Sequence, residues 1–281
     1  MHCTGCEWKE SHGCGGCIET NGNPFHGQCP IAVCCQEKGY LHCGECNVIP
    51  CAALYAYSYL DPEHGDKPPG ERVMTCRNWA GERGIQTWEN VLFTSAGFEG
   101  ENGTRPAIVN RFLKMLGKPP AEAKVLFIPT AADNDEAKAM VPYCKQELIN
   151  LGIADSNIFT HDIDGTMTAD EAMTYDAIYF TGGNATHLLK RVKETGFDAV
   201  VKRMVYSKKV YVGASVGSMI AMPSVGDPSD AENMGLCLIN AYFSVHNAPN
   251  TPPSLDLPLP FIPLTDNQAI AVRWDGYEIV E

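Results

Sequence analysis

The chain has 281 residues, of which 44% are hydrophobic and 20% are charged, as in an ordinary soluble globular protein. Its formal net charge of −13 argues against nucleic acid and anionic membrane surfaces as partners, because both attract clusters of Lys and Arg. No apolar run approaches the roughly 20 residues that span a bilayer, and the first residues lack the basic and apolar regions of a signal peptide, so a cytoplasmic location is expected.

Cysteine is concentrated at the start of the chain, where ten of the thirteen lie between Cys3 and Cys51. Pairs spaced two residues apart allow two thiolates to bind one tetrahedral metal ion, whereas a disulfide framework is not expected in a reducing compartment. We therefore expect zinc in this segment, with an iron–sulfur cluster as one alternative and free thiols or disulfides as another. The candidate ligands are Cys3, Cys6, Cys14, Cys17, Cys29, Cys34, Cys35, Cys43, Cys46 and Cys51.

A turn-rich segment at residues 61–70 follows, and its prolines and glycines cannot continue a helix or a central strand. We place a domain boundary between this segment and about Trp88. The predicted organisation is a small, metal-stabilised, cysteine-rich domain at residues 1–75, a linker at 76–88 and an α/β domain at 89–281.

After residue 90 short apolar runs alternate with amphipathic stretches. The expected strands are 91–94, 125–128, 157–160, 177–181 and 210–213, and the expected helices are 104–116, 136–151 and 185–192. Because these strands are apolar throughout, both faces of the sheet should be covered, which predicts an α/β fold with a mainly parallel sheet and helices on both faces. Beyond about residue 236 strand-like runs dominate, at 261–264, 269–272 and 277–280.

Two segments should lie at the carboxyl ends of the strands, where open α/β sheets bind ligands. In Gly213-Ala-Ser-Val-Gly217, a serine stands between an apolar strand and a helix, as in the G-x-S-x-G turn that carries a nucleophile. The glycines Gly182 and Gly183 follow the strand 177–181 and could expose backbone amides to a ligand, although this pair taken alone favours a tight turn that needs a positive φ. Ser215 is therefore the candidate nucleophile.

A nucleophilic serine needs a base, and downstream of Ser215 the sequence contains one histidine, His246. A loop histidine with no catalytic role is the alternative interpretation. The base in turn requires a carboxylate that fixes its tautomer. Spacing alone leaves five candidates open: Asp227, Asp230, Glu232, Asp256 and Asp266.

Several motifs in the same order resemble the serine peptidase family of aspartyl dipeptidase (peptidase E) and cyanophycinase. The resemblance covers roughly residue 90 to the end and rests on the segments 92–97, 127–132, 181–184 and 213–217, and on the histidine after an apolar run. It implies a fold similar to class I glutamine amidotransferases. The cysteine-rich segment resembles an uncharacterised prokaryotic family, which implies no activity.

The resemblance also implies roles for particular residues. The triad would be Ser215, His246 and Asp266, the last standing where the family commonly carries glutamate. The oxyanion would be held by the amides of Val216 and of Gly182 or Gly183, and the substrate side would include Asn184 and Asp230. The implied reaction is hydrolysis of a small peptide through an acyl-enzyme, with no cofactor needed for catalysis.

Two departures from the family pattern narrow these expectations. Val216 is bulkier than the small residue usual after the nucleophile, and the nineteen residues between His246 and Asp266 contain no Arg or Lys. Specificity for an N-terminal aspartate is therefore not expected, whereas hydrolysis is. The alternative is a catalytically inactive ligand-binding scaffold that carries a metal-binding interaction or sensing module.

Overall fold

Seven strands of the computed structural model form one sheet. Residues 9, 11–16, 19–25, 27–63, 65–100, 103–248, 251–252 and 257–281 are described. The sheet is built from β1 (Val91–Thr94), β4 (Val125–Ile128), β5 (Ile158–Thr160), β6 (Ala177–Phe180), β7 (Val210–Ala214), β10 (Ala269–Arg273) and β11 (Gly276–Val280). The strand order is β11-β10-β1-β7-β6-β4-β5, parallel from β1 to β5, whereas β10 and β11 run antiparallel at one edge.

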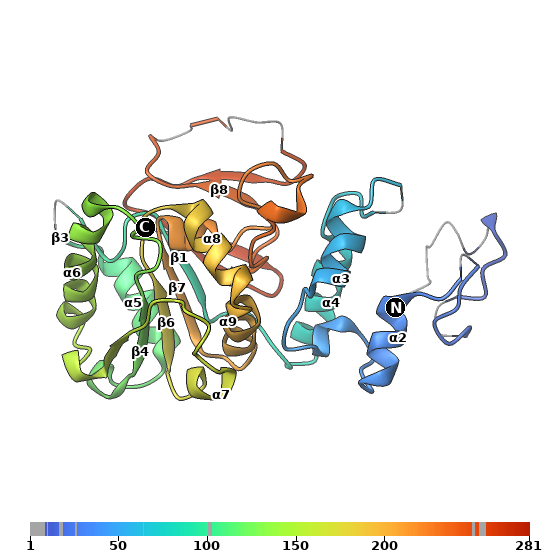
Figure 1. Cartoon of the computed structure of the whole chain (residues 1–281), viewed down its shortest axis with the longest axis horizontal. Helices are drawn as coiled ribbons and strands as arrows, with labels where there is room; N and C mark the ends of the chain where they lie inside the picture. The colour runs from blue at the N-terminus through green and yellow to red at the C-terminus, as the bar shows by residue number, and fades with distance from the viewer. Residues whose placement is uncertain are drawn as a thin grey trace.

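Helices cover both faces of this sheet, as Figure 1 shows. One face packs against α5 (Pro106–Leu116) and α6 (Asp135–Asn150), and the other against α8 (Ala185–Glu194) and α9 (Phe197–Tyr206). Successive residues of β1 illustrate the division, because Leu92 belongs to the hydrophobic cluster of the first face and Phe93 to that of the second. Alternate side chains of a strand point to opposite faces, so strands enclosed in this way must be apolar throughout.

The connections contain shorter elements. They are β2 (Glu99–Gly100), β3 (Gly103–Thr104), η3 (Pro120–Glu122), η4 (Asp155–Asn157), α7 (Ala169–Ala172), α10 (Val216–Met219), η5 (Ala231–Asn233), β8 (Tyr242–Ser244) and β9 (Phe261–Pro263). β8 and β9 pair in parallel outside the main sheet. This small ribbon matters for the site because β8 ends two residues before His246 and β9 three residues before Asp266.

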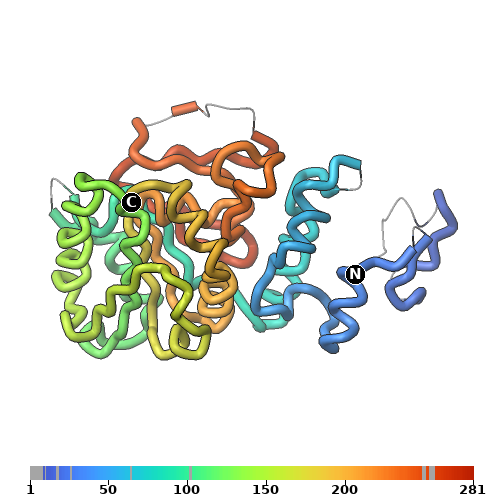
Figure 2. The backbone as a smooth tube through the Cα atoms, viewed as in Figure 1, coloured from blue at the N-terminus to red at the C-terminus, as the bar shows by residue number. Residues whose placement is uncertain are grey.

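Residues 30–82 are mainly helical and lie on the side of the sheet that α9 covers, away from α5 and α6 (Figure 2). Their elements are α2 (Pro30–Glu37), η1 (Cys43–Glu45), α3 (Ala52–Tyr55), the π-helical turn η2 (Ala56–Leu60) and α4 (Glu71–Glu82). Ile49, Leu54 and Val73 are buried in the same hydrophobic cluster as the residues of α8 and α9. The cysteine-rich segment and the α/β domain therefore share one continuous core.

The segment expected to be a linker, residues 76–88, is instead folded and buried. Its first half completes α4, and Arg77, Ala80, Gln86 and Trp88 are all nearly inaccessible to solvent. The Arg77 guanidinium lies over the Trp88 ring, 4.4 Å from its centroid. The prolines and glycines at residues 61–70 mark the start of α4, not a gap between independent domains.

The prediction of an α/β fold with a mainly parallel sheet and helices on both faces is confirmed. Helix α9, which the sequence pattern did not predict, packs against both α8 and β7. No helix of the described residues is long and apolar enough to cross a membrane.

Candidate active site

Ser215 lies at the turn between β7 and α10 in a strained backbone conformation, with φ 51° and ψ −115°. A positive φ is uncommon outside glycine and carries a free-energy cost that the surrounding structure must offset. The flanking glycines are required by close packing. A Cβ on Gly213 would lie 2.4 Å from the Gly217 carbonyl oxygen, and one on Gly217 would lie 2.5 Å from the Phe180 carbonyl oxygen. The G-x-S-x-G pattern thus has a direct steric reason in this fold.

His246 joins the predicted nucleophile to the predicted acid. Its Nε2 lies 2.9 Å from Ser215 Oγ and its Nδ1 lies 2.6 Å from Asp266 Oδ1. An ionised carboxylate can only accept, so Nδ1 donates to Asp266 and Nε2 is left to accept the serine proton. Of the candidate carboxylates that the structure describes (Asp227, Asp230, Glu232 and Asp266), Asp266 is the one that hydrogen-bonds to His246, whereas Asp256 lies outside the described residues. Ser215, His246 and Asp266, which occur in this order along the chain, thus lie together in the folded protein.

The histidine and the carboxylate are both open to solvent, with side chains 49% and 54% exposed. His246 also has a positive φ of 57°, so the nucleophile and the base both occupy left-handed backbone conformations. Because the His246 and Asp266 side chains are about half exposed, a substrate can approach the Ser215–His246 pair from solvent.

Two of the residues expected to form the oxyanion hole, Gly182 and Val216, adjoin the serine. Gly182 packs so closely that a Cβ there would lie 3.2 Å from Ser215 Cβ. Gly183 has φ 142°, and a Cβ on it would lie 2.0 Å from the Ala131 carbonyl oxygen. Val216 is the first residue of α10, where amide groups have no partner within the helix. Gly183 therefore occupies a tight turn that requires glycine, and Gly182 lies beside the nucleophile.

The two residues expected on the substrate side are engaged in local structure. Asn184 caps α8 by accepting from the His187 amide, and its Nδ2 donates to Asp133 at 2.7 Å. Asp230 caps η5 by accepting from the Glu232 amide. Within the described ranges no hydrogen bond or ion pair joins Asp230 to the triad. The expected roles of Asn184 and Asp230 on the substrate side both remain predictions.

Two residues at the end of β1 contact the triad, although no sequence pattern marks either as functional. The Thr94 carbonyl oxygen accepts from the Ser215 amide at 3.1 Å. Ser95 Oγ lies 3.0 Å from Asp266 Oδ1 and accepts from the His246 amide at 2.8 Å. Both belong to a motif on which the family resemblance rests, and that was the only signal in the sequence that could have directed attention to them.

Several cysteines of the N-terminal segment lie together near η1. Every described cysteine is a free thiol, and the Sγ atoms of Cys35 and Cys43 are 3.4 Å apart. A hollow beside them is lined by Cys34, Cys35, Cys43, Cys46 and Cys51. Among the residues that the structure describes, no three His, Cys, Asp or Glu side chains converge to hold a metal ion. Cys3, Cys6 and Cys17 lie outside the described residues.

Comparison with known proteins gives relatives of the α/β part. An uncharacterized peptidase, Lin0382, of Listeria innocua serovar 6a is 34% identical over 103 residues, which are 36% of this chain and 48% of the relative. Peptidase E of Streptomyces coelicolor is 33% identical over 112 residues, 40% of this chain and 43% of the relative. The chain thus spans about half the length of the curated relatives it matches.

A solved structure has the same fold. It is a crystal structure of a Listeria monocytogenes EGD-e protein assigned to peptidase E, 24% identical, which superposes with a TM-score of 0.50 over 69% of this chain and 97% of that one. Residues 1–56 match a family model described as a protein of unknown function (DUF3795). Residues 91–246 match the model of peptidase family S51, and this match spans more than half of the sequence. The chain belongs to peptidase family S51.

Proposed function

We propose that this member of peptidase family S51 is a serine peptidase that hydrolyses small peptides through an acyl-enzyme on Ser215. The observation that carries the proposal is the continuous hydrogen-bonded series from Ser215 Oγ through His246 to Asp266, with separations of 2.9 and 2.6 Å. Heavy-atom distances in this range are those that proton transfer between nucleophile and base requires.

The proposed reaction begins when His246 Nε2 takes the Ser215 proton and Oγ attacks the peptide carbonyl carbon. Negative charge then develops on the carbonyl oxygen, where the amides of Gly182, Gly183 and Val216 would stabilise it; losing one such donor typically lowers the rate about 10²–10³-fold. The imidazolium, stabilised by Asp266, returns its proton to the leaving amine. Water, deprotonated by His246, then hydrolyses the acyl-enzyme and releases Ser215.

The proposed substrates are short peptides without a requirement for an N-terminal aspartate. The segment between His246 and Asp266 contains no Arg or Lys that could bind a substrate carboxylate there. The carboxylates of Asp133 and Asp266 lie near the proposed substrate site, because Asp133 hydrogen-bonds to Asn184 and Asp266 hydrogen-bonds to His246. An acidic substrate side chain would meet these negative charges, so neutral and basic peptides should be preferred.

The test is hydrolysis of a dipeptide library, including α- and β-aspartyl members, followed by mass spectrometry. Turnover by the wild type that disappears in Ser215→Ala would support the proposal and identify the specificity. Equal turnover by both proteins would assign the activity to another nucleophile or a contaminant. If neither protein hydrolyses the library, longer peptides and amides are tested next. Absence of turnover with these substrates as well would favour the alternative of a catalytically inactive ligand-binding scaffold.

For the N-terminal segment we propose zinc bound by cysteine thiolates, with an iron–sulfur cluster as the alternative. The spacing of the cysteine pairs and the proximity of the Cys35 and Cys43 thiols support it. Elemental analysis of the purified full chain tests the proposal. We expect bound metal in the wild type and in Cys144→Ser, a change in the α/β domain, and reduced metal in Cys43→Ser. A metal-free wild-type protein would reject it.

A further inference from the structure

Ser95 is a fully buried serine that directly follows the carboxyl end of β1. β1 lies between β10 and β7 in the sheet, and β7 leads into Ser215. The Ser95 amide donates to the Gln268 carbonyl oxygen at 3.2 Å, which ties this position to the loop that carries Asp266. Ser95 is thus placed where the strands bearing the nucleophile and the acid come together.

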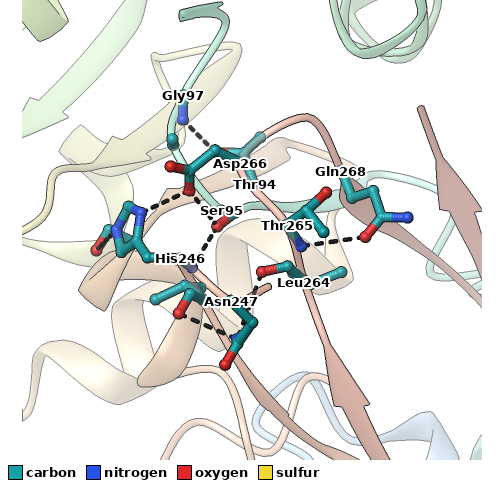
Figure 3. Close-up of polar contacts among 12 residues, drawn as sticks. Thr94, Ser95, Gly97, His246, Asn247, Leu264, Thr265, Asp266 and Gln268 are labelled. Atoms are coloured by element: carbon teal, nitrogen blue, oxygen red, sulfur yellow. Dashed lines mark hydrogen bonds and ion pairs between the residues drawn. The ribbon is translucent and has the colours of Figure 1, made fainter. Parts of the chain in front are cut away.

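The Ser95 hydroxyl bridges two members of the triad, as Figure 3 shows. Its oxygen accepts from the backbone amide of His246 at 2.8 Å and lies 3.0 Å from Asp266 Oδ1. The directions of the two bonds are determined by chemistry. A backbone N–H can only donate and a carboxylate can only accept, so the single hydroxyl proton of Ser95 points to Asp266.

These bonds constrain the two groups that must remain aligned for proton transfer. His246 has a left-handed backbone, and the hydroxyl binds its amide in that conformation. Asp266 Oδ1 is the same oxygen that accepts from His246 Nδ1, so the hydroxyl also restricts rotation of the carboxylate. Because both side chains are about half exposed, solvent alone would not restrain them.

We infer that Ser95 is a positioning residue of the active site, which aligns the His246 backbone and the Asp266 carboxylate through one hydroxyl. The inference rests on the proposed function, because alignment matters only if His246 acts as a base. It extends the triad to a hydrogen-bonded unit of four residues, in which Ser95 touches neither substrate nor the reacting atoms.

The experiment compares Ser95→Ala and Ser95→Thr with Ser58→Ala in the full chain. Ser58 is a matched control, since it is a buried serine that donates to a carboxylate, Asp66, in the N-terminal part. For Ser95→Ala we expect kcat to fall about 10- to 100-fold with little change in KM, because misplaced catalytic groups lose rate more than binding. Ser95→Thr retains a hydroxyl and should recover most of kcat, and Ser58→Ala should match the wild type.

A second readout does not depend on turnover. The proton shared by His246 Nδ1 and Asp266 should give a strongly deshielded ¹H NMR signal, assigned by its absence in Asp266→Asn. We expect this signal to be lost or broadened in Ser95→Ala and retained in Ser58→Ala. An inactive wild type would reject the proposed peptidase, whereas the NMR signal would still decide the role of Ser95. The inference would be overturned if Ser95→Ala kept the NMR signal or the kcat of the wild type. It would also be overturned if Ser95→Thr folded but did not recover kcat.

Discussion

The Nζ of Lys202, in α9, donates to the carbonyl oxygen of Pro50 at 2.9 Å and joins segments 152 residues apart in the sequence. Lys202 is only 3% exposed, and its second partner is Asp198 of the same helix at 3.4 Å. A few residues later in α9, the Tyr206 hydroxyl donates to the Gly44 carbonyl oxygen at 2.9 Å. Polar bonds at buried positions thus fix the cysteine-rich segment on the α/β domain.

We predict that Lys202→Ala lowers the free energy of unfolding by about 1–3 kcal/mol, because the Pro50 carbonyl oxygen loses its buried partner. Urea denaturation monitored by tryptophan fluorescence measures the change. The control is Lys190→Ala in α8, whose side chain is 68% exposed and whose ion pair with Glu194 spans 3.8 Å. Surface pairs of this kind contribute little. Equal effects of the two substitutions would show that the contact to Pro50 does not stabilise the fold.

Gly183→Ala should destabilise the protein and reduce activity together. The added Cβ would lie 2.0 Å from the Ala131 carbonyl oxygen, and the residue has φ 142°. The control is Gly84→Ala, which also has a positive φ, of 67°, but has nothing within 4 Å of an added Cβ. We expect the control to lose about 1–2 kcal/mol, the cost of a left-handed backbone for alanine alone. If both variants lose the same stability in thermal unfolding, the close approach at Gly183 is not what requires glycine.

Asp266→Asn should reduce kcat by about 10²–10⁴-fold while the fold is kept, because an amide favours the wrong histidine tautomer. Steady-state kinetics and circular dichroism together test this. Asp275→Asn is the control, since Asp275 is a half-exposed residue of the β10–β11 hairpin that pairs with Arg273. Normal turnover by Asp266→Asn would exclude Asp266 as the partner of His246.

Glu147 makes the stability dependent on pH. Burial raises the pKa of Glu147 above its usual value of 4.5, and the backbone amides of Phe98 and Glu99, which donate to it, only partly oppose this. Between the unfolded and folded pKa values the folded protein binds more protons, so this contribution to stability falls as pH rises.

The prediction is measured against Glu147→Gln, which cannot ionise. Urea denaturation of both proteins from about pH 4 to 7 should show the wild type losing stability relative to Glu147→Gln as the pH rises. A difference that stays constant, or that grows in favour of the wild type, would contradict the assignment of a raised pKa to Glu147.

Much of the α/β part could be predicted from the sequence, because buried parallel strands are continuous apolar runs. The strands at residues 91–94 and 125–128 match β1 and β4 residue for residue. Helix α9 was missed, although Gly196 before it has a left-handed conformation that begins a new helix at Phe197. The burial of residues 76–88 could not be predicted, because it depends on contacts such as that of Arg77 with the distant Cys237 carbonyl oxygen.

The candidate site was only partly accessible to sequence reasoning. Ser215 stands in a local motif with a steric origin, and His246 was identified because no other histidine follows. Asp266 was selected by family resemblance, since spacing alone left five carboxylates. Ser95 carries no local pattern of its own; its role depends on distances to residues 151 and 171 positions away, which only the folded chain supplies.

Labelling of the full chain with a fluorophosphonate tests whether Ser215 is a nucleophile activated by His246. Such a reagent phosphonylates a serine only when a neighbouring base activates it. Intact-protein mass spectrometry should show one adduct on the wild type, mapped to Ser215 by peptide analysis, and none on Ser215→Ala or His246→Ala. A wild type that remains unlabelled, or an adduct that persists in Ser215→Ala, would contradict the account.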